Sequence, residues 1–211
     1  MLKIEPINYT FSVVITTAGR KSTNAAVASA LRENCPVVLV SDGADLPSDQ
    51  FPCVKWKYVT YVRLGRNFGV IDGVCHYGQT AQNVGVWMAK TKFAMLLGDD
   101  DELIPNSASF MRSKMIERPE VDIWIPGIRY NDGVTLCNQP GLTMGNVSHS
   151  VFRTTVVALE PMYDFLGDNP GTSDYHHLQR CSKRGFNIAW FEKPCVLIRP
   201  HLPGRRGYGE L

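Results

Sequence analysis

The sequence predicts an α/β protein built around a mostly parallel sheet. Apolar runs at 11–17 and 37–41 flank a helix-compatible stretch at 22–34, which is the spacing of a βαβ unit. Both runs are continuously apolar, as expected for strands that helices cover on both faces. A third buried run, at 93–97, leads directly into Gly98-Asp99-Asp100-Asp101. Because ligands bind at the carboxyl ends of strands in open α/β sheets, this acidic turn marks a candidate site.

The other elements follow from periodicity and turn residues. We expect a third strand at 56–62, a helix at 79–90 and, after Pro105, a helix at 107–117. Strands at 121–128 and 134–138 form a hairpin around an Asn-Asp-Gly turn. A helix from about 172 to 184 and two short strands, at 187–191 and 195–199, make the second half mixed. The tail at 200–211, rich in Gly, Pro and Arg, is predicted to be a mobile loop.

Composition excludes several classes of protein. The chain has 211 residues, of which 44% are hydrophobic and 20% charged, and 22 basic minus 20 acidic residues give a net charge of +2. This charge is too small to hold a nucleic-acid backbone, so no nucleic-acid partner is expected. The apolar runs are far shorter than the roughly 20 residues of a membrane span. The N-terminus lacks an apolar leader, and the 6 cysteines form no Cys-x-x-Cys pair, which predicts a cytoplasmic protein with core cysteines.

The acidic turn has two interpretations. Three adjacent carboxylates repel one another, and a bound cation relieves that repulsion. Their hard oxygens favour Mg²⁺ or Mn²⁺. A solvated acidic turn that precedes a helix accounts for the same residues equally well.

Other strand ends carry residues that could contact a ligand. Asp42 follows the strand at 37–41, where its carboxylate could accept a hydrogen bond, although Asp-Gly is also an ordinary turn signal. The first strand ends in the segment Thr16-Thr17-Ala18-Gly19-Arg20, whose small residues would allow a ring to approach the backbone. A plain strand-to-helix turn explains this segment as well.

The second half supplies a candidate base and several cations. Asp174 lies at the start of a helix, where it could either cap the helix or accept a proton from a substrate hydroxyl. His176 and His177 stand beside it and are equally suited to the surface. The end of the chain is rich in donors that match phosphate oxygens, namely Arg199, His201, Arg205 and Arg206.

Taken together, residues 10–201 resemble the GT-A nucleotide-diphosphate-sugar glycosyltransferases, in particular the inverting family 2. Segments 13–20 and 38–43 are similar to the opening strands of that family, the second with its base-contacting aspartate. Segment 78–85 resembles the Gly-rich helix entry that ends Ala-Arg-Asn-x-Gly, with Gln82 in place of the arginine. Segment 96–105 resembles the Asp-x-Asp motif and its proline, with Gly98 where the first acid often stands. Ser173-Asp174 resembles the Glu-Asp pair that holds the catalytic base.

The resemblance implies a GT-A fold in a single domain over 1–211. The donor nucleotide half would span about 1–105, and the acceptor half, about 106–211, would carry a smaller mixed sheet. Asp174 would be the catalytic base. The donor would be bound by Thr16, Thr17, Ala18, Arg20, Asp42, Gln79, Asn83, Asp99, Asp100, Arg205 and Arg206. A Mn²⁺ or Mg²⁺ ion would be held by Asp99, Asp101 and His201, and the acceptor or sugar by Ser148, His149 and His176.

The implied activity is metal-dependent transfer of a hexose or 6-deoxyhexose, with inversion, from a nucleoside diphosphate to a hydroxyl of a glycan or glycoprotein. UDP is the favoured nucleotide. The compact size also resembles the glycosyltransferase domains of chlorella-type large viruses, which glycosylate their own capsids. Two alternatives are a non-catalytic nucleotide-sugar or carbohydrate-binding module and a sugar-nucleotide pyrophosphorylase. A pyrophosphorylase would need a Gly-rich phosphate loop after the first strand, and the turn there is too poor in glycine. A dehalogenase-like phosphatase would need acids after the first strand, where this chain has none.

Overall fold

The structure, a computed structural model, describes residues 10–68, 70–71, 74–75, 78–136, 149–162 and 173–199. Its helices are α1 (Thr23–Arg32), α2 (Gln79–Met88), α3 (Ser107–Glu117), α4 (Thr154–Leu159) and α5 (Ser173–Lys183), with a 3₁₀ turn η1 at Pro52–Lys55. Its strands are β1 (Phe11–Thr17), β2 (Val37–Ser41), β3 (Val59–Arg63), β4 (Val70–Ile71), β5 (Val74–Cys75), β6 (Phe93–Gly98), β7 (Glu102–Leu103), β8 (Ile123–Tyr130), β9 (Thr135–Leu136), β10 (Val151–Arg153) and β11 (Ile188–Ile198).

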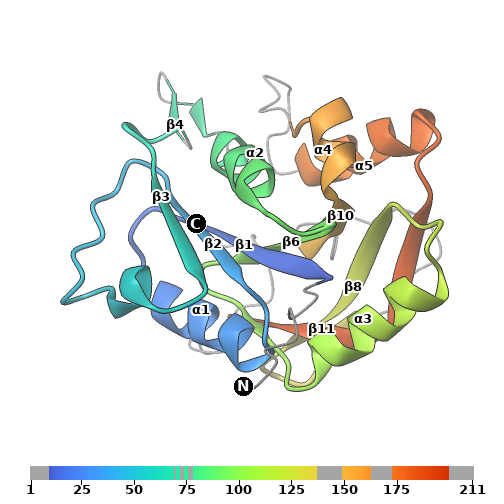
Figure 1. Cartoon of the computed structure of the whole chain (residues 1–211), viewed down its shortest axis with the longest axis horizontal. Coiled ribbons are helices and arrows are strands. Elements are labelled where there is room, and N and C mark those ends of the chain that lie inside the picture. The colour runs from blue at the N-terminus through green and yellow to red at the C-terminus, as the bar shows by residue number, and fades with distance from the viewer. Residues whose placement is uncertain are drawn as a thin grey trace, which may run out of the picture.

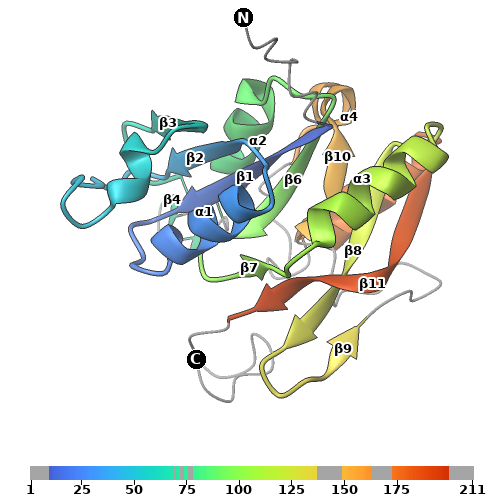
Figure 2. The same cartoon turned by 60° about the horizontal axis from the view of Figure 1, so that its bottom comes forward.

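One sheet organises the described chain. Its strands run in the order β3-β2-β1-β6-β10-β8-β11-β7, with β9 paired to β8. Strands β3, β2, β1 and β6 are mutually parallel, while β10 is antiparallel to both β6 and β8. The mixed part therefore continues the parallel part through the β6–β10 pair. Figure 2 shows the long strand β11, which pairs with β8 along most of its length and with the short strand β7 near its carboxyl end.

Helices cover both faces of this sheet, as the continuously apolar strands predict (Figure 1). On one face, the core contains Val13 and Ile15 of β1 together with residues of α1, which packs on β1 and β2, and of α3, which packs on β11. On the other face, the core contains Val14 together with residues of α2, α4 and α5; α2 packs on β1 and β2, and α4 packs on β10 and α2. Gly85 lets α2 approach closely, because a Cβ at this position would overlap Val14 Cγ1. The predicted α/β class with a mostly parallel sheet is confirmed.

Several predicted bounds need correction. The third strand begins at Val59, since Pro52–Lys55 forms the η1 turn and Trp56 caps it. The two strands expected at 187–191 and 195–199 are one strand, β11, whose register shifts between Trp190 and Val196. The hairpin forms between β8 and β9, with residues 137–138 outside the described part. The predicted tail at 200–211 also lies outside the described residues.

Hydrogen bonds from α1 and from Glu33 hold the chain just after the acidic turn. Ser29 of α1 accepts a hydrogen bond from Leu103 N at 3.0 Å, and Arg32 donates to Leu103 O at 3.2 Å. The Glu33 carboxylate, at the end of α1, accepts from the backbone N–H groups of Asn106 and Ala108 at 2.9 and 3.1 Å. It thus satisfies two donors at the start of α3, which have no partner within the helix. These bonds hold β7 and α3 in place and so determine where the acidic turn lies.

Two further sequence expectations concern the whole chain. In the described part, no helix has the length and the apolar character needed to cross a membrane. The cysteines whose side chains are described are buried and form no disulfide with one another: Cys35, Cys53, Cys181 and Cys195. They act as core residues, as predicted.

Candidate active site

The carboxyl ends of β1, β2 and β6 meet at one edge of the sheet. In the parallel register, Thr17 is the partner of Ser41, and Thr16 is the partner of Gly98. The residues that follow, Asp42 and Asp99, therefore stand on either side of the end of β1. The predicted positions of Asp42 and Asp99 at the ends of strands in a parallel sheet are confirmed.

Thr17 connects the first strand to the acidic turn. The residue is buried, with 3% of its surface exposed. Its hydroxyl donates to Asp99 Oδ2 at 2.6 Å and accepts from the N–H groups of Gly19 and Arg20 at 3.0 and 3.3 Å. Gly19 has a φ of +96°, which L side chains rarely adopt. Thr16 is half-buried and Ala18 exposed beside this turn. The segment is a tight turn at the edge where the strand ends meet, and a ligand contact by it stays a prediction.

Each carboxylate of the triplet has cationic or donor partners. Arg20, which is exposed, places Nη1 at 3.4 Å from Asp99 Oδ1 and 2.7 Å from Asp100 Oδ2. Arg199 places Nε at 3.3 Å from Asp100 Oδ2 and donates its backbone N–H to Asp101 Oδ1 at 2.8 Å. Arg20 therefore occupies a cation position between two carboxylates at the surface of the turn.

Asp101 turns away from that surface. Its Oδ2 lies 2.8 Å from His149 Nε2, and both side chains are more than nine-tenths buried. A Cβ at Gly98 would overlap Asp101 Oδ2, so the absence of a side chain at Gly98 makes room for this carboxylate.

Burial acts differently on these acids. It raises the pKa of Asp99, against the hydrogen bond from Thr17 and the charge of Arg20. Burial would also raise the pKa of Asp101, but the hydrogen bond and charge of His149, together with Arg199, outweigh it and hold that pKa below its usual value. Asp101 is therefore an ionised acid that the protein itself compensates.

Asp99 and Asp100 are the two acids of the turn whose chemistry would suit a cation, and a metal ion there stays a prediction. Both carboxylates face the exposed guanidinium of Arg20, and one or two carboxylates with substrate phosphates are the usual Mg²⁺ ligands in proteins. Within the described ranges no three His, Cys, Asp or Glu side chains converge on one point. Of the predicted metal ligands, Asp101 faces His149, and His201 lies outside the described residues.

Asp42 lies at the neighbouring strand end and is 5% exposed. Its N–H donates to Thr17 O at 2.8 Å, and its Oδ1 accepts from Phe68 N at 2.7 Å. Its Oδ2 faces the start of α2, where a Cβ at Gly78 would be 3.7 Å away. No sequence pattern indicates the Phe68 contact, because it depends on backbone geometry alone.

Two predicted donor-binding amides on α2 differ in their contacts. Asn83 donates to Met162 O at 2.6 Å and accepts from Met162 N at 3.0 Å, so its amide joins α2 to the segment after α4. Gln79 is 1% exposed, and neither its Oε1 nor its Nε2 has a hydrogen-bond partner among the described residues. A nucleotide contact by either residue stays a prediction.

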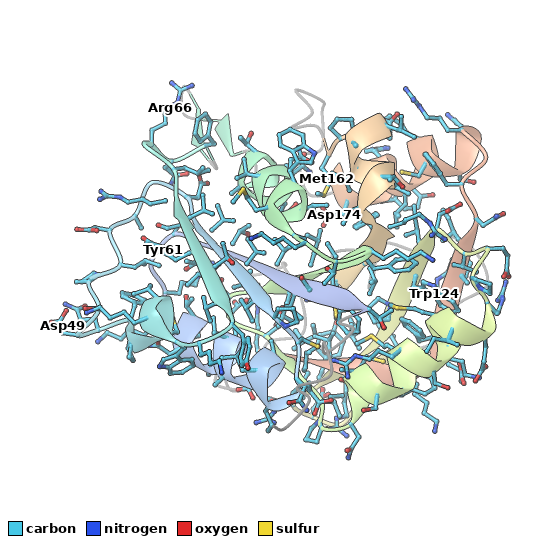
Figure 3. The ribbon with its side chains drawn as sticks, in the orientation of Figure 1. Asp49, Tyr61, Arg66, Trp124, Met162 and Asp174 are labelled. Atoms are coloured by element: carbon cyan, nitrogen blue, oxygen red, sulfur yellow. The ribbon has the colours of Figure 1, made fainter. Side chains whose placement is uncertain are left out.

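Asp174 lies in the first turn of α5 and is half-buried. Figure 3 labels it, together with Met162, in the region between α2 and the α4–α5 pair. Burial raises the pKa of Asp174, while the charge of His149 acts in the opposite direction.

The other predicted site residues are placed as follows. His176 is exposed, with Nδ1 at 3.2 Å from Gln179 Oε1 on its own helix, and shows no contact with the described acids of the turn. Ser148, His201, Arg205 and Arg206 lie outside the described residues. Arg199, which the sequence identifies only as part of a basic tail, contacts Asp100 directly. The sequence feature that could have indicated this contact is the position of Arg199 directly after the last strand.

Comparison with solved structures places this arrangement among known folds. S. aureus TarS 1–349 superposes with a TM-score of 0.71 at 14% identity, covering 90% of this chain and 60% of that one. Its complex with UDP gives 0.67 at 14% identity, covering 89% and 60%, and its complex with UDP-GlcNAc gives 0.63 at 14% identity, covering 94% and 60%. No protein-family model and no curated protein sequence matches the chain.

These values define the class of protein by its fold. The chain has the α/β fold of the TarS glycosyltransferase, with a mixed, mostly parallel sheet flanked by helices. It spans about 60% of the length of TarS 1–349. At 14% identity, the similarity to TarS establishes the fold alone.

Proposed function

We propose that the chain is a glycosyltransferase that moves a hexose or 6-deoxyhexose from UDP to a hydroxyl of a glycan or glycoprotein with inversion. The observation that carries this proposal is the meeting of Thr17, Asp42 and Asp99 at one sheet edge. Asp174 lies on a separate element, α5, and its pKa is affected by the charge of His149, which contacts Asp101 in the acidic turn. The fold supports the proposal, because TarS structures with the same fold contain UDP and UDP-GlcNAc. The cytoplasmic location and a viral capsid acceptor stay predictions from the sequence.

The donor would lie along the edge formed by the three strand ends. Asp42 would accept a hydrogen bond from the base, as the resemblance implies, and Thr17 would form the adjacent wall. Arg20 would turn from the acids to the diphosphate, since its guanidinium is exposed and matches phosphate oxygens in a bidentate geometry. Asp99 and Asp100 would hold Mn²⁺ or Mg²⁺. That ion would supply positive charge against the diphosphate leaving group.

Asp174 would act on the acceptor. Its raised pKa makes its carboxylate a stronger base than an exposed aspartate, and a general base must take a proton from the attacking hydroxyl. The hydroxyl oxygen would form the new bond to the anomeric carbon as the bond to the diphosphate oxygen breaks on the opposite face. This direct displacement inverts the anomeric configuration.

The experiment is a turnover assay that detects UDP release from a panel of UDP-hexoses in the presence of sugar acceptors and Mn²⁺. We expect acceptor-dependent release that stops in Asp174→Asn. Binding of UDP without any turnover across the panel, in wild type and variant alike, would favour the non-catalytic module. Product linkage determined by NMR tests inversion separately.

A further inference from the structure

Glu160 is a buried acid on which several side chains of α5 and its end converge. The residue follows α4 directly and is 4% exposed. Its Oε1 accepts a hydrogen bond from Arg180 Nε at 2.6 Å, and its Oε2 lies 2.6 Å from Arg184 Nε. Its backbone carbonyl oxygen lies 2.8 Å from Nε2 of the buried His177. One residue therefore binds three side chains spread over two turns of helix.

The two arginines also bind the backbone on either side of Glu160. Arg180 donates from Nη2 to Pro161 O at 3.3 Å, and Arg184 donates from Nη1 to Leu159 O at 3.1 Å. Because Arg180 and Arg184 are four residues apart, they lie one above the other along the same side of the helix. Two such anchors fix both the rotation of α5 about its axis and its position along that axis.

Asp174 lies on the side of α5 that packs into the core. His177, Leu178 and Cys181 follow it at the spacing of one helical face, and each is at most 1% exposed. Leu178 and Cys181 belong to the same core cluster as Val14 of β1. A rotation or slide of α5 would therefore carry Asp174 with it.

The segment that holds α5 is also bonded to α2. Met162 exchanges two hydrogen bonds with the Asn83 amide, at 2.6 and 3.0 Å. Helix α2 begins just after Gly78, where a Cβ would be 3.7 Å from Asp42 Oδ2. Figure 3 shows Met162 and Asp174 in the region between α2 and the α4–α5 pair. Residues 159–162 thus connect the helix of the candidate base to a helix that starts at the edge where the strand ends meet.

We propose that Glu160 is a positioning residue, which holds Arg180 and Arg184 so that α5 presents Asp174 at the correct place for the transfer reaction. This inference rests on the proposed function, since it needs Asp174 to be the base. A buried ion pair adds little to stability compared with apolar residues of the same size, whereas its hydrogen bonds impose a strict geometry. A catalytic group that is misplaced by about 1 Å can lose about 100-fold in rate.

The test is steady-state kinetics of Arg180→Met and Arg184→Met with a UDP-hexose that wild type turns over. Each change removes one anchor of α5 and leaves Asp174 and Asp42 in the chain. We expect kcat to fall between about 10- and 100-fold, while the KM for the UDP-hexose and the Kd for UDP stay within about twofold of wild type. Arg184→Lys keeps a cation for Glu160 and should recover part of kcat.

The matched control is Arg153→Met on β10. Arg153 resembles Arg180 in exposure, with side chains 20% and 24% exposed, and in its contacts. Its Nε donates to Asp122 Oδ1 at 3.0 Å and its Nη2 to Pro119 O at 2.8 Å, away from α5. Arg153→Met should therefore lower the melting temperature about as much as Arg180→Met and leave kcat unchanged.

Arg184 has a side chain that is 57% exposed, so Arg184→Met should fold even where Arg180→Met does not. An unchanged kcat in a folded Arg184→Met or Arg180→Met variant would overturn the inference. An equal loss of kcat in Arg153→Met would also overturn it, because general destabilisation would then explain the effect. If wild type turns over no UDP-hexose, the proposed function itself fails, which is a separate result from either of these.

Discussion

Thr17 and Asp99 join two neighbouring strand ends through a buried hydrogen bond of 2.6 Å between Thr17 Oγ1 and Asp99 Oδ2. The same hydroxyl accepts from the N–H groups of Gly19 and Arg20. One side chain therefore holds both the turn after β1 and the first acid of the triplet. This arrangement makes Thr17 a structural requirement of the site, whichever ligand the site binds.

Thr17→Val tests that requirement. Valine keeps the shape but leaves a buried carboxylate oxygen without its donor, and two N–H groups without their acceptor. We expect the free energy of unfolding to fall by about 1–3 kcal/mol, as measured by urea denaturation. Thr17→Ser keeps the hydroxyl and should retain most of the stability. Equal stability of the Val and Ser variants would show that the hydroxyl is not needed.

Asp174→Asn separates catalysis from binding. The amide cannot accept the proton, so turnover should fall by at least about 100-fold, while the affinity for UDP measured by calorimetry stays unchanged. Burial raises the pKa of Asp174, so its charged form is disfavoured in the folded protein and the neutral amide should not lower stability. An active Asp174→Asn variant would remove Asp174 from the mechanism.

The same shift in pKa predicts how the rate depends on pH. As the proposed base, Asp174 would work only when ionised, and its pKa lies above the usual value for an aspartate. The kcat/KM of the wild-type enzyme should therefore fall as the pH drops through this raised pKa, at a higher pH than an exposed aspartate would give. A pH–rate profile with its acid limb at the usual pKa of aspartate would contradict the assignment.

If Asp99 and Asp100 hold a metal ion as proposed, Arg20 would compete with it for the same two carboxylates. Its removal in Arg20→Met leaves both carboxylates without this guanidinium, so Mn²⁺ alone, without nucleotide, should bind about threefold more tightly or better. Lys21→Met is the matched control, because it changes net charge equally at the next, exposed residue. Calorimetry of Mn²⁺ binding compares the two variants. Equal gains would show a general charge effect and no specific competition.

The buried His177 should make the stability of the protein depend on pH. Burial lowers its pKa from 6.5 to about 4, and its Nε2 lies 2.8 Å from Glu160 O, where the neutral ring donates its proton. Between these two pH values the unfolded chain binds the proton and the folded chain does not. Stability should therefore fall by roughly 3 kcal/mol as the pH drops from 6.5 to 4.

His177→Gln keeps a donor for Glu160 O and cannot titrate, so it should lose this part of the pH dependence. Denaturation at several pH values measures the difference between the variant and wild type. Parallel curves for the two proteins would contradict the assignment of this step to His177.

The half of the site that lies on long, apolar strands is predictable from the sequence. Strands β1, β2 and β6 are visible as uninterrupted apolar runs, and parallel strands place their carboxyl ends at one edge, so strand pattern alone brings Asp42 and Asp99 together. The contact of Arg199 with Asp101 joins residues 98 positions apart through strands β7 and β11. It is not predictable, because β7 has two residues, too few for a periodic signal.

The roles of single amides are not predictable from the sequence either. Gln79 and Asn83 lie one helical turn apart, and the family resemblance assigns both to the donor. Only the packing of α2 against the segment at Met162 shows that the amide of Asn83 is used within the fold and that of Gln79 is not. The pairing of Asp101 with His149 depends on Gly98, where the absence of a side chain leaves room for the carboxylate.

The most direct test of the central claim is calorimetric titration of UDP into the wild-type chain with and without Mn²⁺, with GDP, dTDP and CMP as comparisons. We predict saturable binding of UDP that Mn²⁺ strengthens and that Asp42→Ala weakens. Absence of binding for all these nucleotides, in a chain that melts cooperatively, would contradict the claim that the meeting strand ends form a nucleotide-sugar site.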